Sequence, residues 1–378
     1  MTTTQQRPIK VLNALWLLGV GGIENLLVNV LRRLDRERFQ MDFLVASQFE
    51  QHYDETVRAL GSRLVLGKQS NDPWRSEREL AAINRRFGPY DVIHSHRHFS
   101  GVALLRAAHR LGIPVRIAHG HAIRRGEGPP MDRIGFAVAR HLTRKHCTHG
   151  LAVSRDAGRS LFGEGWEADR RFELLPGAVD FTPFLAENRR SQVRRALQLP
   201  DDAIAIAHTG RFVGSKNHRF IVAVARALCR LSERHHFLLI GDGPLLQPIR
   251  ELVDYEGLGH RVRFAGSRSD VPELLLPMDA FIFPSLTEAF GLAAVEAQAA
   301  GLTCFLSDQV VPEVDVVPEL LQRLPLAAGP GFWAERILAH GPPRISQQQA
   351  LARCRASRLN IDAYVDSLSE IYRSAADA

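Results

Sequence analysis

Short β-like runs alternate with segments of helical length along almost the whole chain, and this alternation occurs twice. In the first half, apolar strand candidates at residues 11–18, 91–94 and 115–118 are separated by helix-like stretches. The pattern begins again at residues 203–208 and continues through residues 237–240. Strands that alternate with helices form βαβ units, whose parallel strands are covered on both faces. The sequence therefore predicts an α/β protein with two doubly wound domains in tandem.

The chain length supports two domains, because a single hydrophobic core seldom fills 378 residues. A charge run with Pro183 near residues 180–195 indicates the joint, so we expect an N-terminal domain at 1–180 and a C-terminal domain at 181–356. The remaining residues, 357–378, predict a terminal amphipathic helix with one buried face. Its apolar residues at helical spacing are Leu359, Ile361, Tyr364, Leu368 and Ile371.

The composition is that of an ordinary folded protein, with 45% hydrophobic and 24% charged residues. The cysteines form no close pair, which argues against a disulfide framework and for a reducing, cytoplasmic compartment. The apolar run at residues 11–20 is too short to span a bilayer and lacks the flanks of a signal peptide. We therefore expect a soluble or peripheral protein. The four cysteines are Cys147, Cys229, Cys304 and Cys354.

Positive charge is concentrated in the first half. Residues 1–180 hold 27 Lys and Arg against 19 Asp and Glu, whereas the remainder holds 21 against 22. A basic half suits an anionic partner such as lipid headgroups, a lipid-linked pyrophosphate or nucleic acid. An arginine-rich face that is merely solvated explains the excess equally well. The densest stretch contains Arg124, Arg125, Arg133, Arg140, Arg144 and Lys145.

A glycine-rich turn, Gly19-Val20-Gly21-Gly22, follows the first strand candidate and precedes a helix-like segment. Glycines in such a turn allow backbone N–H groups and the positive end of the helix to approach an anion. The spacing matches neither a Walker loop nor a dinucleotide fingerprint. A plain tight turn is the alternative interpretation.

Two cations follow the first strand of the second half, Arg211 in Gly210-Arg211-Phe212 and Lys216 before Asn217-His218. Cations at the carboxyl edge of a parallel sheet are well placed for a pyrophosphate. Arginine can hold two oxygens at once, while lysine supplies a point charge. Two ordinary surface cations in a loop would look the same.

Two glutamates, Glu288 and Glu296, have seven residues between them at a loop-to-helix junction. If the helix begins near Phe290, its free N–H groups face phosphate oxygens, and both carboxylates can face one ligand. Glu296 lies among small apolar residues, where a buried carboxylate needs a partner. Ribose hydroxyls would serve, and a structural salt bridge is the alternative.

Two further glycine turns follow strand candidates. Residues 241–244, which include Gly241 and Gly243, are interpreted as a structural turn. Residues 266–271 include Arg268 and could present backbone groups to a base ring. A turn that Asp270 caps as the N-cap of the next helix is an equally good interpretation.

Taken together, these motifs resemble the retaining glycosyltransferases of family 4, in the branch found in bacterial exopolysaccharide and capsule synthesis. The resemblance runs from the turn at residues 19–22 to the last helix. It implies the GT-B fold, in which two Rossmann-like doubly wound domains face a central cleft. It also implies that the terminal helix, 357–378, packs back on the N-terminal domain.

The resemblance implies roles for the candidate residues of the second half. Arg211 and Lys216 would hold the donor pyrophosphate and stabilise charge on the departing nucleotide diphosphate. Glu296 would accept the ribose hydroxyls, Arg268 would border the nucleobase, and Glu288 would lie beside the donor sugar. Backbone amides would reach the sugar hydroxyls and the phosphate. Those amides belong to Ala289, Phe290, Gly291 and Leu292.

In the first half, the resemblance implies that Gly21 and Gly22 approach the phosphates. The sugar-side histidine of the family matches His119 best, with His121 as a possible substitute. The implied reaction transfers a hexose, with a UDP-sugar as the expected donor, to a glycan or polyprenyl-pyrophosphate-linked acceptor. The anomeric configuration is retained by front-face attack. No metal and no other cofactor is expected, because the two cations neutralise the diphosphate.

One departure concerns the donor sugar. Relatives in the exopolysaccharide branch commonly have Gly-Leu-Pro after the first glutamate, whereas this chain continues with Ala289-Phe290-Gly291-Leu292. That sequence is frequent elsewhere in family 4, so activity is expected to persist. The choice of donor sugar is less safely inherited.

Four other functions compete. His94, His96 and His98 on one face of a strand would suit zinc, but companion carboxylate or cysteine ligands are sparse. A nucleic-acid binder is disfavoured because aromatic residues make up only 7% and no recognition motif is present. A sugar-nucleotide epimerase on the same fold and a non-enzymatic GT-B scaffold that binds an anionic surface stay as alternatives.

Overall fold

The computed structural model describes residues 7–68, 72–124, 130–186 and 190–376, and the chain divides into two compact units. Unit 1 contains residues 1–178 together with 361–378, and unit 2 contains residues 179–360. The boundaries between the units lie after residues 178 and 360, whereas the sequence predicted them after residues 180 and 356. Residues 357–360 do not belong to the last helix, because Val179 and Asn360 pair in a short parallel bridge at the edge of unit 2.

Unit 1 is built around a parallel sheet of seven strands in the order β3-β2-β1-β4-β5-β6-β7. The strands are β1 (Ile9–Ala14), β2 (Phe39–Val45), β3 (Leu64–Leu66), β4 (Val92–Ser95), β5 (Val115–Gly120), β6 (His149–Ala152) and β7 (Phe172–Leu174). The helices are α1 (Gly22–Arg33), α2 (Asp54–Ala59), α3 (Pro73–Phe87), α4 (Val102–Arg110), α5 (Pro130–His146), α6 (Arg155–Phe162) and α14 (Ile361–Ala376). This is the doubly wound pattern predicted from the alternation of elements.

Consecutive residues of β1 and β2 pack into different hydrophobic cores on the two faces of the unit 1 sheet. Val11 packs in the core beneath α1 and α14, whereas the next residue, Leu12, packs in the core beneath α3 and α4. Phe43 and Leu44 are divided between the two cores in the same way. Because side chains alternate across a strand, a sheet with helices on both faces needs such continuous apolar runs.

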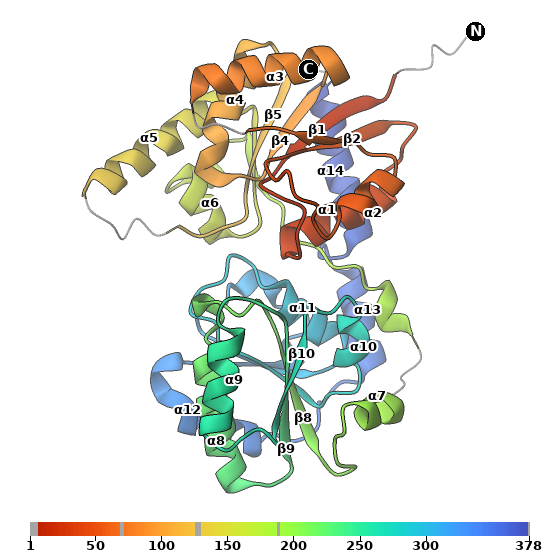
Figure 1. Ribbon diagram of the computed structural model, residues 1–378, viewed down its shortest axis with the longest axis vertical. Coiled ribbons are helices and arrows are strands. Elements are labelled where there is room, and N and C mark those ends of the chain that lie inside the picture. The colour runs from red at the N-terminus through yellow and green to blue at the C-terminus, as the bar shows by residue number, and fades with distance from the viewer. Residues whose placement is uncertain (1–6, 69–71, 125–129, 187–189, 377–378) are drawn as a thin grey trace. The chain divides into compact units, whose positions relative to one another are not determined.

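The last helix, α14, belongs to unit 1 and packs against the beginning of the chain. Figure 1 shows α14, drawn in blue, beside α1 and β1, drawn in red. Tyr364, Leu368 and Tyr372 of α14 are buried with the apolar face of α1. The C-terminal segment therefore forms part of the N-terminal core.

Unit 2 repeats the architecture with six parallel strands in the order β10-β9-β8-β11-β12-β13. The strands are β8 (Ile204–Thr209), β9 (His235–Ile240), β10 (Val262–Gly266), β11 (Ala280–Phe283), β12 (Thr303–Ser307) and β13 (Leu321–Leu324). The helices are α7 (Arg190–Ala196), α8 (His218–Leu231), α9 (Leu246–Tyr255), α10 (Val271–Leu275), α11 (Leu292–Ala299), α12 (Gly329–Leu338) and α13 (Gln347–Ala356).

Both sheets have a point at which the order of strands reverses, between β1 and β4 in unit 1 and between β8 and β11 in unit 2. The loops that leave such neighbouring strands diverge, and they open a crevice at the carboxyl edge of the sheet. The strand predicted at 11–18 ends at Ala14, so residues 15–21 form the loop at this edge of unit 1. None of the helices that the structure describes is both long and apolar enough to cross a membrane.

Candidate active site

In unit 2, two loops meet at the carboxyl edge where the strand order reverses. Residues 210–217 follow β8 and residues 284–291 follow β11, and these two strands are neighbours in the sheet. The amide of Leu286 donates a hydrogen bond to the carbonyl of Ser215 at 2.8 Å. The side-chain amide of Asn217 donates to the carbonyl of Pro284 at 3.1 Å. These bonds join the loop that carries the predicted cations to the loop that carries the first predicted glutamate.

Lys216 and Glu288 form an ion pair across the two loops, between Nζ and Oε1. The same carboxylate oxygen accepts a hydrogen bond from the hydroxyl of Ser285 at 2.7 Å. Glu288 is buried, and the ammonium of Lys216 lies 4.8 Å from the centre of the Phe283 ring. The cation is therefore held in one place by a carboxylate and by an aromatic face.

Arg211 projects from the same loop into solvent. Its side chain is exposed, and within the described part of the chain it makes no hydrogen bond or ion pair. The next residue, Phe212, is buried and stacks on the ring of His218 at 3.9 Å between centroids. Because Phe212 anchors the loop from inside, Arg211 extends outward from a fixed point of backbone.

Gly241 and Gly243 support the loop that carries Arg211. A Cβ on Gly241 would lie 2.1 Å from the carbonyl oxygen of Gly210, and one on Gly243 would lie 2.7 Å from that of Phe212. Both glycines have φ in the range that side chains disfavour, 140° and 152°. The amide of Phe212 donates to the carbonyl of Asp242 at 2.9 Å. These contacts agree with the structural interpretation of this turn.

Helix α11 begins at Leu292, two residues later than the start near Phe290 that the sequence suggested. The N-cap residue, Gly291, has a φ of 102°, and no side chain caps the helix. The chain turns through this left-handed glycine before the helical hydrogen bonds begin, which accounts for the later start. The first N–H groups of α11 are therefore left for another partner.

Glu296 lies in the second turn of α11 and is half-buried among small apolar residues. Burial raises the pKa of its carboxyl group to about 7. Its carboxylate forms neither an ion pair nor a hydrogen bond with any residue that the structure describes. Among the described residues Glu296 therefore has no partner for the structural salt bridge that is the alternative interpretation.

Arg268 lies on the turn after β10 and is engaged by a near neighbour. Its Nε donates to Oδ1 of Asp270 at 2.7 Å, and its Nη2 donates to Oδ2 at 2.5 Å. The guanidinium–carboxylate bonds hold the pKa of Asp270 below its usual value. Asp270 occupies the N-cap position of α10, but its side chain does not bond the helix N–H groups. Asp270 is thus the N-cap residue of the alternative interpretation, but its carboxylate binds Arg268 instead of the helix N–H groups.

In unit 1, the glycine-rich turn leads directly into α1. Gly21 is the N-cap residue in an extended conformation, and Gly22 is the first residue of the helix. No side chain caps this end of α1. A Cβ on Gly21 would lie 2.3 Å from Oε2 of Glu24, which is the far end of a flexible side chain and can move aside.

Four histidine rings form a cluster at the carboxyl edge of the unit 1 sheet. Nε2 of His94 lies 3.1 Å from Nδ1 of His119, and Nδ1 of His96 lies 2.9 Å from Nε2 of His121. Burial lowers the pKa of all four, to about 3 for His94 and His121. His119 belongs to β5 and is completely buried, whereas His121 follows the strand and is partly exposed.

The set of histidines that could hold a metal differs from the one considered from the sequence. Ring nitrogens of His94, His96 and His119 lie within 4.8 Å of one another. Hydrogen bonds to neighbouring side chains already occupy ring nitrogens of each of the three. His98 does not share their face, because it has a φ of 50° and bonds Ser160 Oγ at 3.3 Å.

Comparisons with known proteins give the family. Residues 20–182 match the family described as Glycosyltransferase Family 4, and residues 189–323 match Glycosyl transferases group 1. EpsF of Bacillus subtilis (strain 168), provisionally named a glycosyltransferase, is 33% identical over 351 residues, which cover 91% of each chain. This chain belongs to glycosyltransferase family 4.

Two further likenesses concern a named activity and the fold. This glycosyltransferase is 26% identical, over 58% of each chain, to the UDP-Gal:alpha-D-GlcNAc-diphosphoundecaprenol alpha-1,3-galactosyltransferase of Escherichia coli. It superposes on the crystal structure of HepE from Anabaena in complex with UDP with a TM-score of 0.79 at 17% identity, covering 97% of this chain and 100% of the other. The predicted GT-B fold is confirmed.

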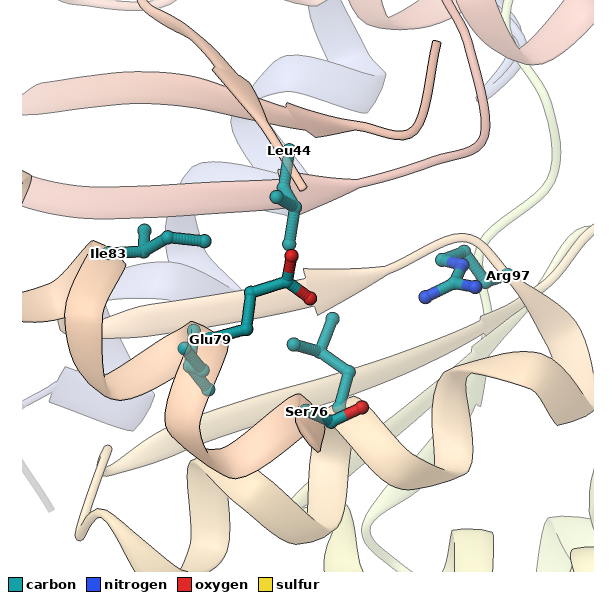
Figure 2. Close-up of a pocket in the computed structure, with 7 residues that line it drawn as sticks. Leu44, Ser76, Glu79, Ile83 and Arg97 are labelled. Atoms are coloured by element: carbon teal, nitrogen blue, oxygen red, sulfur yellow. The ribbon is translucent and has the colours of Figure 1, made fainter. Parts of the chain in front are cut away.

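One buried cation of the glycosyltransferase was not among the residues predicted from the sequence. Arg97 is buried, and its guanidinium packs on the ring of Trp16 at 4.0 Å. Trp16 stands in the loop between β1 and the glycine-rich turn. Figure 2 shows Arg97 and Glu79 on opposite sides of a small cavity, with Leu44 and Ser76 between them. Burial lowers the pKa of Arg97 to about 10, although Glu79 opposes the shift.

The basic stretch of unit 1 of the glycosyltransferase contains residues with different roles. Arg144 is engaged structurally, since it pairs with Asp169 at 3.3 Å and packs over Phe172. Arg124 is exposed, and Arg140 donates to the carbonyl of Ser160 at 3.1 Å, both beside a surface hollow of about 300 Å³. Arg125 and the side chain of Arg133 lie outside the residues that the structure describes.

Proposed function

We propose that this glycosyltransferase transfers a hexose from a nucleotide-diphosphate sugar, a UDP-sugar, with retention of anomeric configuration. The observation that carries the proposal is the grouping at the carboxyl edge of unit 2. A fixed ammonium, an exposed guanidinium and an uncapped helix end lie on loops that leave neighbouring strands. Such an arrangement attracts a diphosphate, and it favours the charge that develops when the diphosphate leaves.

Different residues of unit 2 would bind different parts of the donor. Arg211, which has no partner among the described residues, and Lys216 would bind the two phosphates. The N–H groups at residues 289–292 would reach phosphate oxygens and sugar hydroxyls. Glu296, whose carboxylate lacks a partner in the described structure, would accept the ribose hydroxyls. Arg268 would border the base, and Glu288 would lie beside the sugar.

The chemical step balances without a further reactant. The acceptor hydroxyl attacks the anomeric carbon from the face that the phosphate leaves, so the new glycosidic bond has the original configuration. The bond between the anomeric carbon and the phosphate oxygen breaks, and the nucleoside diphosphate departs. A phosphate oxygen takes the proton of the acceptor hydroxyl. Arg211 and Lys216 supply the positive charge, so the proposal includes no metal and no cofactor.

His121 is our choice for the histidine that contacts the sugar. His119 was the first choice from the sequence, but its ring is completely buried within β5. His121 follows the strand, is partly exposed, and lies at the same edge as the turn at Gly21 and Gly22. A side chain must be exposed to meet a ligand, so exposure favours His121.

We further propose that the acceptor is a glycan or a lipid-linked diphosphate sugar in exopolysaccharide or other cell-surface polysaccharide synthesis. The likeness to EpsF and to the diphosphoundecaprenol-dependent galactosyltransferase supports this class of acceptor. The excess of cations in residues 1–180 supports an anionic partner for unit 1, either the acceptor or the inner face of the plasma membrane. The four free cysteines agree with a cytoplasmic location.

The test is release of nucleotide from a panel of UDP-, GDP- and ADP-sugars with a chelator present. Release of UDP from one donor is the expected result, and the NMR spectrum of a product glycoside would report retention. Binding without release would assign the missing component to the acceptor. Neither binding nor release from any donor would favour the scaffold alternative, and conversion of the donor without transfer would favour an epimerase.

A further inference from the structure

Asn13, His96 and His121 form a hydrogen-bonded chain across three neighbouring strands of unit 1. Asn13 lies on β1, His96 follows β4 and His121 follows β5. Nε2 of His96 lies 3.0 Å from Oδ1 of Asn13, and Nδ1 of His96 lies 2.9 Å from Nε2 of His121. The amide of His96 also donates to the carbonyl of Ala14 at 2.9 Å, which fixes the ring beside β1. The chain thus begins in the core of the sheet and ends at a partly exposed ring.

His96 and His121, the two histidines of this hydrogen-bonded chain, are both neutral at neutral pH. Burial lowers the pKa of His121 to about 3 and that of His96 well below its ordinary value, and the neighbouring His94 and His98 lower them further. A neutral imidazole has one N–H donor and one acceptor nitrogen. Which nitrogen carries the proton is set by the hydrogen bond that the other nitrogen makes.

The direction of the chain follows from its first member. The oxygen of Asn13 can only accept, so Nε2 of His96 carries the proton. Nδ1 of His96 is then an acceptor, and it must receive the proton of His121 Nε2. Nδ1 of His121 is left with a lone pair, and among the described residues no side chain donates to it. The end of the chain is a hydrogen-bond acceptor.

We propose that Asn13 is a positioning residue that fixes His121 with its proton on Nε2, so that Nδ1 accepts a hydrogen bond from a hydroxyl of the bound sugar. The inference rests on the proposed function, because it takes the sugar to lie against His121. It goes beyond that function by naming the residue that orients the histidine. It also names the chemistry of recognition, a sugar hydroxyl that donates rather than accepts.

A second chain in the same cluster provides a matched control. Nδ1 of His94 lies 2.8 Å from the hydroxyl of Tyr372, and Nε2 of His94 lies 3.1 Å from Nδ1 of His119. This chain ends on the completely buried His119 and shares no hydrogen bond with the first. Removing the hydroxyl of Tyr372 also takes one hydrogen bond from the histidine cluster, but it leaves the partners of His121 in place.

The experiment compares N13L, N13D and Y372F with the wild-type protein in donor turnover and in the ¹⁵N chemical shifts of the histidine rings. The shifts distinguish the two tautomers without any substrate. In the wild type and in N13D, whose carboxylate can also accept from His96, we expect His121 to be protonated on Nε2. In N13L the tautomer should no longer be fixed, and kcat should fall at least roughly tenfold, because a catalytic histidine in the wrong tautomer acts poorly.

The outcomes separate this inference from the proposed function. N13D is expected to keep most of the turnover that N13L loses, and Y372F is expected to turn over like the wild type. A proton on Nδ1 of wild-type His121, or unchanged kinetics and shifts in N13L, would overturn the inference. So would an equal loss in Y372F and N13D, which indicates a structural effect only. A wild-type protein that turns over no donor would overturn the proposed function, while the ring shifts would still decide the tautomer.

Discussion

Lys216 and Glu288 are paired at the carboxyl edge of unit 2, where each comes from the loop that follows one of two adjacent strands. The pair is largely removed from water, because Glu288 is buried and the side chain of Lys216 is 19% exposed. Ser285 donates to the same carboxylate oxygen. A charge in such surroundings acts more strongly than one in water, and it needs no rearrangement when a diphosphate leaves.

Substitution of Lys216 by Ala is therefore expected to slow turnover more than it weakens nucleotide binding. A preorganised charge at a developing anion contributes a factor of roughly 10² to 10³ in kcat. Steady-state kinetics on the donor found in the panel measure the effect. R219A removes an exposed cation near the start of α8 and should behave like the wild type. A wild-type kcat in K216A would contradict the role given to Lys216.

The same substitution has a predicted cost in stability. Without Lys216, the carboxylate of Glu288 stays buried with Ser285 as its remaining partner, and loss of one member of a buried ion pair costs roughly 3 kcal/mol. The double variant K216A/E288Q removes the uncompensated charge. We expect denaturant unfolding to show that the double variant regains most of the stability but none of the turnover. If the double variant is as unstable as K216A, the loss comes from packing rather than from the buried charge.

The pKa of Glu296 makes stability depend on pH. Its carboxyl has a pKa of about 7 in the folded chain against an ordinary value of 4.5, so the folded state binds the proton more tightly. Stability contributed by this group is therefore present below pH 4.5 and is lost as the pH rises through 7. The loss is at most about 3 kcal/mol, reduced by the partial exposure of the side chain. E296Q should unfold at higher denaturant concentration at pH 8 and lose this part of the pH dependence.

Nucleotide binding should also depend on the protonation of Glu296, but the affinity should rise with pH where the stability falls. An ionised carboxylate can accept two ribose hydroxyls, whereas the protonated form accepts less well. UDP affinity is thus expected to rise as the pH increases through 7, and E296Q should bind UDP weakly at every pH. Calorimetric titration with UDP between pH 6 and 8 measures both effects. Pyrophosphate, which has no ribose, is the control ligand, and an equal loss of pyrophosphate binding in E296Q would contradict the assignment.

Much of the fold could be predicted from the sequence because its signals are local. The alternation of strands and helices and the apolar spacing at Ile361, Tyr364 and Leu368 depend on near neighbours in the chain. The two parallel sheets were therefore predicted correctly. The joining of the loops at Lys216 and Glu288 also follows from the rule that parallel strands end at one edge of the sheet.

The remaining features depend on contacts between distant parts of the chain. In the sequence, Tyr372 is a further apolar residue at helical spacing. Its hydroxyl reaches His94 only because α14 packs on unit 1. Arg97 is buried against Trp16, and only the pairing of β1 with β4 brings these two parts of the chain together. The burial of His119 and the partial exposure of His121 depend on where β5 ends, because His119 lies within the strand and His121 follows its last residue, Gly120.

The basic stretch of unit 1 gives a prediction for membrane association. Substitution of Arg124, Arg125 and Arg133 by Gln should weaken binding to vesicles that contain anionic lipid. Each cation near such a surface contributes roughly 1 kcal/mol, so the partition constant should fall roughly hundredfold at low salt. Sedimentation with vesicles measures it. The control, R226Q/R230Q/R336Q, removes the same charge from unit 2, and an equal loss in that variant would point to net charge alone.

Substitution of Gly243 by Ala tests the support of the Arg211 loop. A Cβ at this position would meet the backbone of Phe212 at 2.7 to 3.0 Å, and the backbone has a φ of 152°. The backbone of Phe212, whose ring is buried, cannot move aside as a flexible side chain can. We expect a loss of roughly 2 to 3 kcal/mol in the free energy of unfolding, together with weaker pyrophosphate binding, because the displaced loop carries Arg211. Gly331 in α12 has open space around its Cβ position, so G331A should be neutral or slightly stabilising. If G243A keeps both wild-type stability and wild-type pyrophosphate affinity, the backbone contact between the turn and the loop does not hold Arg211 in place.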